Sequence, residues 1–172
     1  MPKSYPKPEK KIKIKACDFR KKYGKRLKTK NAKPKLSDKI KELDKWFSRA
    51  VRLMWVDDGL VKCASCSKKD HPKNMDCGHF FNRDSKALRW SFNNCRPQCP
   101  VRSFGCNSKM DRPEVQNAFR QTLINQGVNI EAMEIKRRNT VKYTVFELDL
   151  LIKECQGIVK YQLKNKNIEK WW

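Results

Sequence analysis

The sequence predicts an α+β fold, in which a small metal-stabilised core of short strands lies between flanking α-helices and follows a basic N-terminal arm. Three observations indicate this class. Six of the eight cysteines and both histidines lie within residues 60–110, where long periodic stretches are few. Apolar residues recur at helical spacing on both sides of that segment. Residues 1–37 are rich in lysine and interrupted by proline, so they lack the pattern of a regular element.

Composition limits the class of partner. The chain of 172 residues carries 41 Lys+Arg against 18 Asp+Glu, a formal net charge of +23. Self-repulsion on that scale destabilises a compact state unless a polyanion offsets it, and DNA and RNA are the usual polyanions. No amphipathic basic helix opens the chain and no run of about 18 apolar residues occurs, which disfavours a membrane partner.

The N-terminal segment also indicates the compartment. It is basic but has no apolar stretch of the kind that a secretory signal needs, so we expect a cytoplasmic protein. The cytoplasm is reducing, which makes the cysteines poor candidates for disulfides and typical of a metal site. A hydrophobic fraction of 38% allows only a lean core, which a metal would stabilise.

The first 37 residues form the predicted arm. They hold fifteen Lys/Arg and two acids, and we expect them to be disordered and to follow the backbone of a nucleic acid. The alternative is a solvated leader that only aids solubility.

Residues 38–112 are predicted to form the core together with a helix over 38–55 that precedes it. Ser37 is expected to cap this helix, and Asp38 suits its first turn. Asp57-Asp58-Gly59 should end it. The apolar stripe of this helix comprises Ile40, Leu43, Phe47, Ala50, Val51 and Met54.

Residues 113–172 are predicted to form a helical region that packs on the core. Pro113 fits the first turn of a helix over 113–126, and Gly127 fits its end. Thr144 and Glu147 form a capping-box pattern at the start of a helix over 145–164. The apolar face of that helix comprises Leu148, Leu151, Ile152, Cys155, Ile158, Val159 and Leu163.

The cysteines within 60–110 predict one structural zinc site. Cys63 and Cys66 form a CxxC knuckle, and Cys99 and Cys106 supply a second pair further along the chain. Zinc is tetrahedral and prefers thiolates, so two such pairs close one site. Cys99 and Cys106 are separated by six residues, more than a tight knuckle has, which leaves Cys95 with Cys99 as an alternative second pair.

Other cysteines and one histidine are weaker candidates. His71 is a possible ligand, but a turn before Pro72 is the simpler interpretation. Cys77 is interpreted as a small buried apolar residue. Cys17 and Cys155 lie far from the cluster and are interpreted as simple thiols.

A pattern of one histidine and two asparagines runs from the segment between the two cysteine pairs to the residue after the second pair. His79 lies on a short strand predicted near residues 75–81, Asn94 shortly precedes a P-x-C step, and Asn107 directly follows Cys106, the last cysteine of the two pairs. This pattern is similar to that of HNH endonucleases. The similarity implies a treble-clef-like ββα-metal core, with a β-hairpin that carries His79 and a short helix that begins near Asn107.

The wider arrangement resembles the phage NinG (Rap) recombination endonucleases in particular, over roughly residues 38–165. The motifs that carry the resemblance are Cys63-x-x-Cys66, Asp76-x-Gly78-His79, Leu88-Arg89, Asn94-x-x-x-Gln98-Cys99 and Cys106-Asn107. Two features depart from the pattern. The family usually ends its zinc site with C-x-x-C-N, whereas six residues separate the cysteines here. Gly78 stands where many HNH enzymes carry a metal ligand.

The residue types suit phosphodiester hydrolysis. A neutral imidazole accepts a proton near neutral pH, so His79 is the predicted general base. Asp76 shares the strand parity of residue 78, and Asp76 with Asn107 would hold a catalytic Mg²⁺ or Mn²⁺ through oxygen atoms. Asn94 is expected to hydrogen-bond the loop that presents His79. Phosphate contacts are expected from Arg83, Lys86, Arg89, Arg96, Arg102 and Lys109.

The function that these expectations favour is a metal-dependent DNA endonuclease. The resemblance implies cuts that leave a 5′-phosphate, branched recombination intermediates such as D-loops and Holliday junctions as substrates, and the cytoplasm of a host cell as the location. A non-catalytic zinc module that binds nucleic acid is the alternative; it explains the charge and the cysteines but not the grouping of His79 with two asparagines. A ribosome-associated basic zinc protein is a third hypothesis. The sequence leaves the oligomeric state open, a dimer included.

Overall fold

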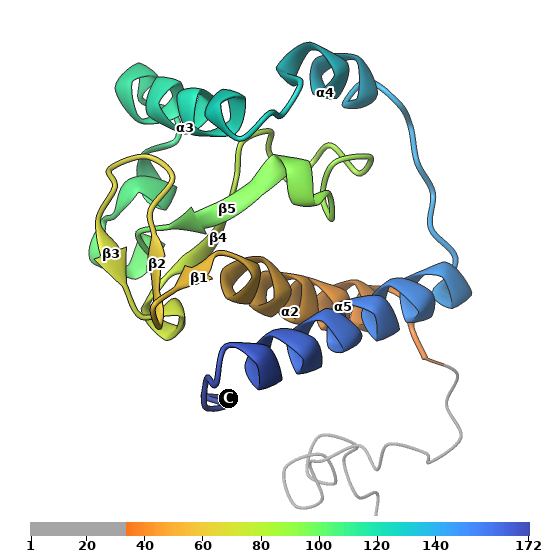
Figure 1. Cartoon of the computed structure of the whole chain (residues 1–172). Coiled ribbons are helices and arrows are strands. Elements are labelled where there is room, and N and C mark those ends of the chain that lie inside the picture. Colours follow the sequence, from red (N-terminus) through yellow and green to blue (C-terminus); the bar gives the residue numbers. More distant parts are fainter. Residues whose placement is uncertain (1–33) are drawn as a thin grey trace, which may run out of the picture. The chain divides into compact units, whose positions relative to one another are not determined.

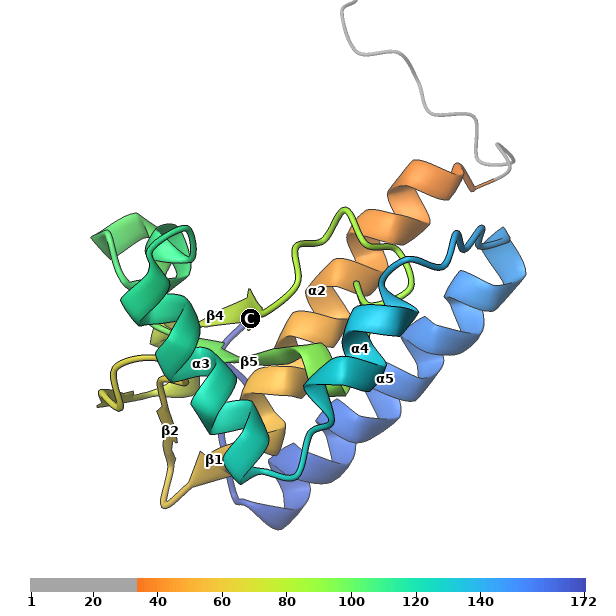
Figure 2. The same ribbon diagram turned by 90° about the horizontal axis from the view of Figure 1, so that it is seen from above.

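Two long helices form the base of the molecule in the computed structural model, which describes residues 34–172. α2 (Leu36–Met54) and α5 (Val145–Asn165) lie side by side in both views (Figures 1 and 2). Their facing stripes are close to those predicted: the buried residues are Leu43, Phe47, Ala50, Val51 and Leu53 of α2 and Leu148, Ile152, Cys155 and Val159 of α5. The arm predicted at residues 1–37, with Cys17, lies almost wholly outside the described residues.

The start of α2 differs from the prediction. Its N-cap is Lys35, whose side chain makes no capping hydrogen bond, and Ser37 lies inside the first turn with Asp38. The prediction that Ser37 caps the helix is therefore wrong. At the other end, Lys166 Nζ donates to the carbonyl oxygens of Leu53, Met54 and Val56, at 3.2, 2.9 and 2.7 Å. A cation at a helix C-terminus satisfies carbonyl groups that have no partner within the helix.

Three very short strands follow α2. β1 (Val56–Asp57), β2 (Leu60–Lys62) and β3 (Lys69–Asp70) form an antiparallel sheet in that order. Asp58 and Gly59, with φ of 47° and 71°, make the two-residue turn between β1 and β2. Two left-handed residues suit the twist of a hairpin, so the Asp57-Asp58-Gly59 segment makes a hairpin and does not mark the helix end. The helix ends earlier, at Trp55.

A second pair of strands carries most of the motif residues. β4 (Asp76–His79) and β5 (Cys95–Gln98) are antiparallel, with Asp76 opposite Gln98 and His79 opposite Cys95. In Figure 1 this pair lies between α2 and α5 on one side and α3 (Pro113–Asn125) and α4 (Ile130–Lys136) on the other. One apolar core fills the α2–α5 side, and a smaller one fills the α3–α4 side.

The helix expected near Asn107 is only a 3-10 turn, Cys106–Lys109. The α-helix starts later, at Pro113, because a residue before proline avoids the helical region and Arg112 is extended, with ψ 127°. Pro113 opens α3 and Gly127 follows its end with φ 75°, as predicted. α4 is short and was not predicted.

Pro34–Trp172 forms a single unit in which α2, from the predicted core region, packs on α5, from the predicted C-terminal region. Short strands and helices are both present, so the described chain is α+β. Among residues 34–172, no helix is both long and apolar enough to span a membrane.

Candidate functional site

Four cysteines meet at the end of the β4–β5 pair. The sulfur atoms of Cys63, Cys66, Cys99 and Cys106 all lie within 4.8 Å of one another. Cys66 Sγ is 3.4 Å from Cys99 Sγ, and the Cys99 backbone N–H donates to Cys63 Sγ at 3.4 Å. Thiols this close cannot all ionise without a cation between them, and burial raises the pKa of Cys99 to about 12. The group can hold a metal ion such as zinc.

The structure separates the alternatives for the fourth ligand. Cys95 is fully buried in the core that α2 and α5 form, outside the cysteine group, so Cys106 completes the set. His71 is also outside it. Its Nδ1 accepts a hydrogen bond from the Lys73 backbone N–H at 3.1 Å, in the turn that was expected before Pro72.

Cys99 and Cys106 come close together despite their wide spacing in the sequence, because the loop between them folds back on itself. The Gly105 N–H donates to Pro100 O at 3.0 Å, and the Asn107 N–H donates to Cys99 O at 3.1 Å. A Cβ atom at Gly105 would lie 2.6 Å from Cys99 Cβ, so only glycine fits there. The six-residue insertion therefore brings its two ends together and keeps both cysteines in one site.

Asp76 and Asn107 lie together beside this loop. Asp76 Oδ2 accepts hydrogen bonds from the Val101 backbone N–H at 2.8 Å and from Asn107 Nδ2 at 3.2 Å. β4 supplies the carboxylate, and the turn after Cys106 supplies the amide. The two residues predicted to hold a divalent cation are thus adjacent in space, although they are 31 positions apart along the chain.

Gln98 lies across from Asp76 and was not predicted as a site residue. A Cβ atom at Gly78 would overlap the Gln98 amide oxygen, so Gln98 occupies the space that a side chain at residue 78 would need. Gln98 is fully buried; its Nε2 donates to Ser65 Oγ at 2.8 Å and to Met110 Sδ at 3.1 Å. Its Oε1 is buried and has no hydrogen-bond partner among the described residues. A buried oxygen without a partner is costly unless a ligand or water satisfies it.

One hydrogen bond fixes the tautomer of His79. Its Nε2 lies 3.0 Å from the carbonyl oxygen of Arg89. A carbonyl only accepts, so Nε2 carries the proton and Nδ1 keeps its lone pair. Burial lowers the pKa of His79 below its ordinary value of 6.5, and the charge of Arg83 adds to this, while the carbonyl groups of Arg89 and Cys77 oppose it. His79 is therefore neutral at pH 7 and can accept a proton.

Asn94 joins the two segments that hold His79. Its Oδ1 accepts from the Phe81 N–H at 2.8 Å, and its Nδ2 donates to Phe81 O at 2.9 Å and Leu88 O at 3.1 Å. Phe81 follows His79 closely, and Leu88 precedes Arg89, whose carbonyl accepts from the His79 ring. Asn94 is fully buried, so these bonds are shielded from water.

His79 and Asn107 line one cavity of about 560 Å³. No hydrogen bond joins His79 to Asp76 or Asn107 within residues 34–172, because His79 and Asp76 differ in strand parity. The cavity wall also includes charged residues that the sequence did not single out. Its lining comprises His79, Phe80, Phe81, Asn82, Arg83, Asn107, Met110, Asp111, Gln116 and Arg137.

Cys77 and Cys95 lie close to His79. The ligand atoms of these three residues also lie within 4.8 Å of one another, so they form a second donor set that can hold a soft metal. Cys77 is buried, as predicted, and burial raises the pKa of Cys95 well above its ordinary value.

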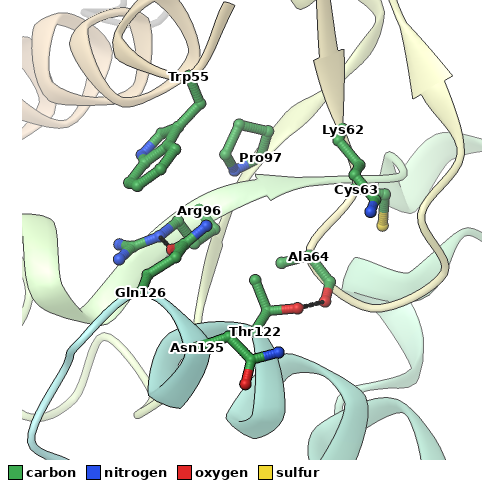
Figure 3. A pocket seen from close by; sticks show the side chains of 9 residues that line it. All are labelled: Trp55, Lys62, Cys63, Ala64, Arg96, Pro97, Thr122, Asn125 and Gln126. Atoms are coloured by element: carbon green, nitrogen blue, oxygen red, sulfur yellow. Dashed lines mark hydrogen bonds between the residues drawn. The ribbon is translucent and has the colours of Figure 1, made fainter.

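Two of the arginines expected to contact phosphate have other partners. Arg96 is only 4% exposed; it donates to Gln126 Oε1 and to the carbonyl groups of Phe92 and Cys95, and it stacks on Trp55 at 4.3 Å (Figure 3). The expectation that Arg96 contacts phosphate is therefore wrong, because the sequence did not reveal its burial. Arg89 forms a bidentate pair with Asp44, at 3.1 and 2.7 Å.

The other four basic residues are more available. Arg83, Lys86 and Arg102 are exposed and Lys109 is half-buried, and none of them forms an ion pair with any residue from 34 to 172. Arg83 lines the cavity of His79.

Comparison with known proteins gives one match. The family model described as bacteriophage lambda NinG protein matches residues 3–167. Neither the curated proteins nor the solved structures include a match to this chain. Since the family model spans nearly the whole chain, the protein belongs to the bacteriophage lambda NinG family.

Proposed function

We propose that this protein is a metal-dependent DNA endonuclease of the HNH type, with branched recombination intermediates such as D-loops and Holliday junctions as substrates. One observation carries the proposal: His79 and Asn107 meet at a single cavity, and Asn107 is hydrogen-bonded to Asp76. β4, β5 and, after two 3-10 turns, α3 follow one another in the strand–strand–helix order that a ββα-metal core would have, which supports the proposal.

A zinc ion at the four cysteines would organise the site. Cys99 follows Gln98 directly, and Cys106 directly precedes Asn107. Holding the two cysteines in one metal centre therefore fixes two side chains that face Asp76. Structural zinc in small domains contributes about 10–16 kcal/mol of apparent binding energy, more than the whole stability of a lean core.

Asp76, Asn107 and Gln98 suit a hard divalent cation. All three offer oxygen atoms, and the Gln98 amide oxygen is buried without a partner from residues 34–172. Oxygen ligands favour Mg²⁺ or Mn²⁺ over zinc. When bound, such a cation polarises the phosphate and stabilises the departing 3′ oxygen.

His79 would act as the general base. Its Nδ1 lone pair accepts the proton of the attacking water, and the Arg89 carbonyl stabilises the imidazolium that forms through its bond to Nε2. Attack at phosphorus with loss of the 3′ oxygen leaves a 5′-phosphate and a 3′-hydroxyl. Arg83, Lys86, Arg102 and Lys109 would contact neighbouring phosphates.

A non-catalytic zinc protein that binds nucleic acid is the second candidate. What favours it is the position of His79 on the Cys77 and Cys95 side of β4, opposite in parity to Asp76.

One experiment separates the two. Zinc-loaded full-length protein is incubated with labelled four-way junction, duplex and single-stranded DNA, each with Mg²⁺, with Mn²⁺ and with chelator. The proposal expects cation-dependent cuts with 5′-phosphate ends, most rapidly on the junction. Binding to all three DNAs without cleavage by either cation would favour the second candidate.

A further inference from the structure

The loop between Cys99 and Cys106 presents an aromatic ring to solvent. Phe104 is 80% exposed, more than any other large apolar residue of the described chain, and Val101 on the same loop is 49% exposed. Arg102 lies between them and is exposed as well. An aromatic side chain left in water forgoes the free energy that burial would give, so such exposure is informative when the loop has no freedom to fold the ring inward.

The loop holds Phe104 in a fixed, strained conformation. Phe104 has φ 51° and ψ 34°, in the left-handed region that bulky residues rarely adopt. Its N–H donates to Val101 O at 2.9 Å, and the next residue, Gly105, packs against Cys99 without room for a side chain. The ring therefore lies on a short turn that hydrogen bonds and close packing hold between two of the four clustered cysteines. Its exposure does not result from a flexible loop.

The same loop contacts the candidate cation site. The Val101 N–H donates to Asp76 Oδ2 at 2.8 Å, and Asn107 follows Phe104 by three residues. The turn that carries Phe104 thus contacts the carboxylate proposed to hold the cation, with the positive charges of Arg102 and Lys109 on either side of Phe104 along the chain.

From these observations we infer that Phe104 stacks on an unstacked nucleobase next to the cleaved bond; this rests on the proposed function. A phenyl ring stacks on any base, which suits recognition without sequence preference. Bases within a duplex are already stacked on both faces, whereas a base at a branch point or in a single strand offers a free face. Arg102 and Lys109 would contact the flanking phosphates. Phe104 would therefore give the preference for branched DNA that His79, Asp76 and Asn107 do not supply.

The test compares Phe104→Ala with Phe146→Ala in the full-length, zinc-loaded protein. Phe146 is a matched control, because it is 70% exposed but lies at the start of α5. Binding to junction, single-stranded and duplex DNA is measured without Mg²⁺ or Mn²⁺, so that it does not depend on cleavage. A 2-aminopurine base at the branch reports stacking by its fluorescence.

Phe104→Ala should weaken binding to the junction by about 5- to 150-fold, the range seen when one stacking ring is removed, and leave duplex binding unchanged. It should also abolish the change in 2-aminopurine fluorescence. Phe146→Ala should alter neither. An equal loss on single-stranded DNA would identify any unpaired base as the ligand, and an intact single-strand affinity would restrict it to the branch.

A second variant guards against misfolding. Phe104→Gly removes the ring and relieves the left-handed strain, so its melting temperature should equal or exceed that of the wild type while junction binding falls. Equal junction affinities of Phe104→Ala and Phe146→Ala, or a parallel loss on duplex DNA, would overturn the inference. A protein that binds through Phe104 but never cleaves would instead refute the proposed function alone.

Discussion

A series of hydrogen bonds that begins at Asp44 of α2 fixes the position of His79. Asp44 accepts hydrogen bonds from Arg89 at 3.1 and 2.7 Å and from Trp90 Nε1 at 2.8 Å. Burial would raise the pKa of Asp44, but the bonds from Arg89 and Trp90 outweigh it and the pKa is lowered, so the carboxylate stays ionised. The Arg89 backbone carbonyl is thereby fixed in place, and it in turn fixes the ring of His79. Arg89 therefore positions the ring that we propose as the base.

Replacement of His79 by alanine should remove cleavage without removing binding. A general base is typically worth about 10² to 10⁴ in rate, and one neutral side chain contributes little to electrostatic affinity. Single-turnover cleavage and DNA affinity of His79→Ala measure the two effects. His71→Ala is the matched control, since His71 caps a turn and packs on Trp171, and it does not line the cavity of His79. Cleavage by His79→Ala at the wild-type rate would mean that another group accepts the proton.

The pH dependence of cleavage should have a defined sign. The pKa of His79 is lowered from 6.5, chiefly by burial, so the neutral imidazole persists at pH 7 and is lost only as the pH falls through that lowered value. The single-turnover rate should therefore be flat around neutral pH and decline on the acidic side of 6.5. Phe81→Ala, which opens one wall of the cavity, should move the decline toward higher pH. A rate that already falls as the pH is lowered from about 8 to about 7, a range wholly above ordinary histidine titration, contradicts the assignment.

Helices and turns were predicted correctly where a few neighbouring residues specify them, and were missed where the pattern is too short or overlaps with that of the next element. The capping box of α5 forms as predicted, with Thr144 N–H donating to Glu147 at 2.7 Å and Glu147 N–H donating to Thr144 Oγ1 at 3.2 Å. The Asp58-Gly59 hairpin was missed although the dipeptide is a strong turn signal, because the apolar stripe of α2 ran directly into it. α4 has seven residues, too few to show a helical period.

Some residues of the candidate site could likewise be predicted from the sequence, whereas others depended on the packed structure. Cysteine spacing was sufficient to name Cys63, Cys66 and Cys99, but the choice of Cys106 over Cys95 depended on how the loop between the pairs folds back. The misplacement of Arg96 has a similar origin, since only the packed structure shows that Trp55 and Gln126 enclose it. Gln98 is the cross-strand partner of Asp76, and only the register of β4 against β5, which the sequence did not reveal, places the two on one face.

Loss of one cluster ligand should release the metal. Cys66 is the most exposed of the four, so Cys66→Ser disturbs packing little and tests ligation itself. We expect zinc content to fall from one ion per chain, and the thermal transition to broaden or vanish. Metal analysis and near-ultraviolet circular dichroism provide the readouts. Cys155→Ser, a buried thiol of α5 outside the cluster, should keep its zinc. Full zinc retention by Cys66→Ser would exclude this ligand set.

Over the whole molecule, positive charge is distributed unevenly. Residues 1–33 carry fourteen Lys/Arg and two acids, out of 41 and 18 in the chain. Removing this segment leaves Pro34–Trp172, which is a unit with its own core. Affinity for DNA from such a segment arises from release of counterions and carries no sequence information.

Deletion of residues 1–33 should reduce the salt dependence of DNA binding. If the segment neutralises even five phosphates, the log–log slope of affinity against salt concentration should fall by about 4 to 5. Binding to one duplex over a range of salt concentrations measures this. The truncated protein should keep its zinc and its melting temperature. An unchanged slope would assign the segment no part in binding.

The pairing of α2 with α5 has a consequence for the order of assembly during synthesis. Lys166, which closes the end of α2, is 113 residues beyond Leu53. A ribosome adds about 5–20 residues per second, so roughly 5 to 20 seconds pass between the synthesis of α2 and that of α5, against which its apolar face packs. All four cluster cysteines leave the ribosome within that interval. A nascent chain can therefore acquire zinc first and enclose its larger core only afterwards, with α2 open to chaperones in the meantime.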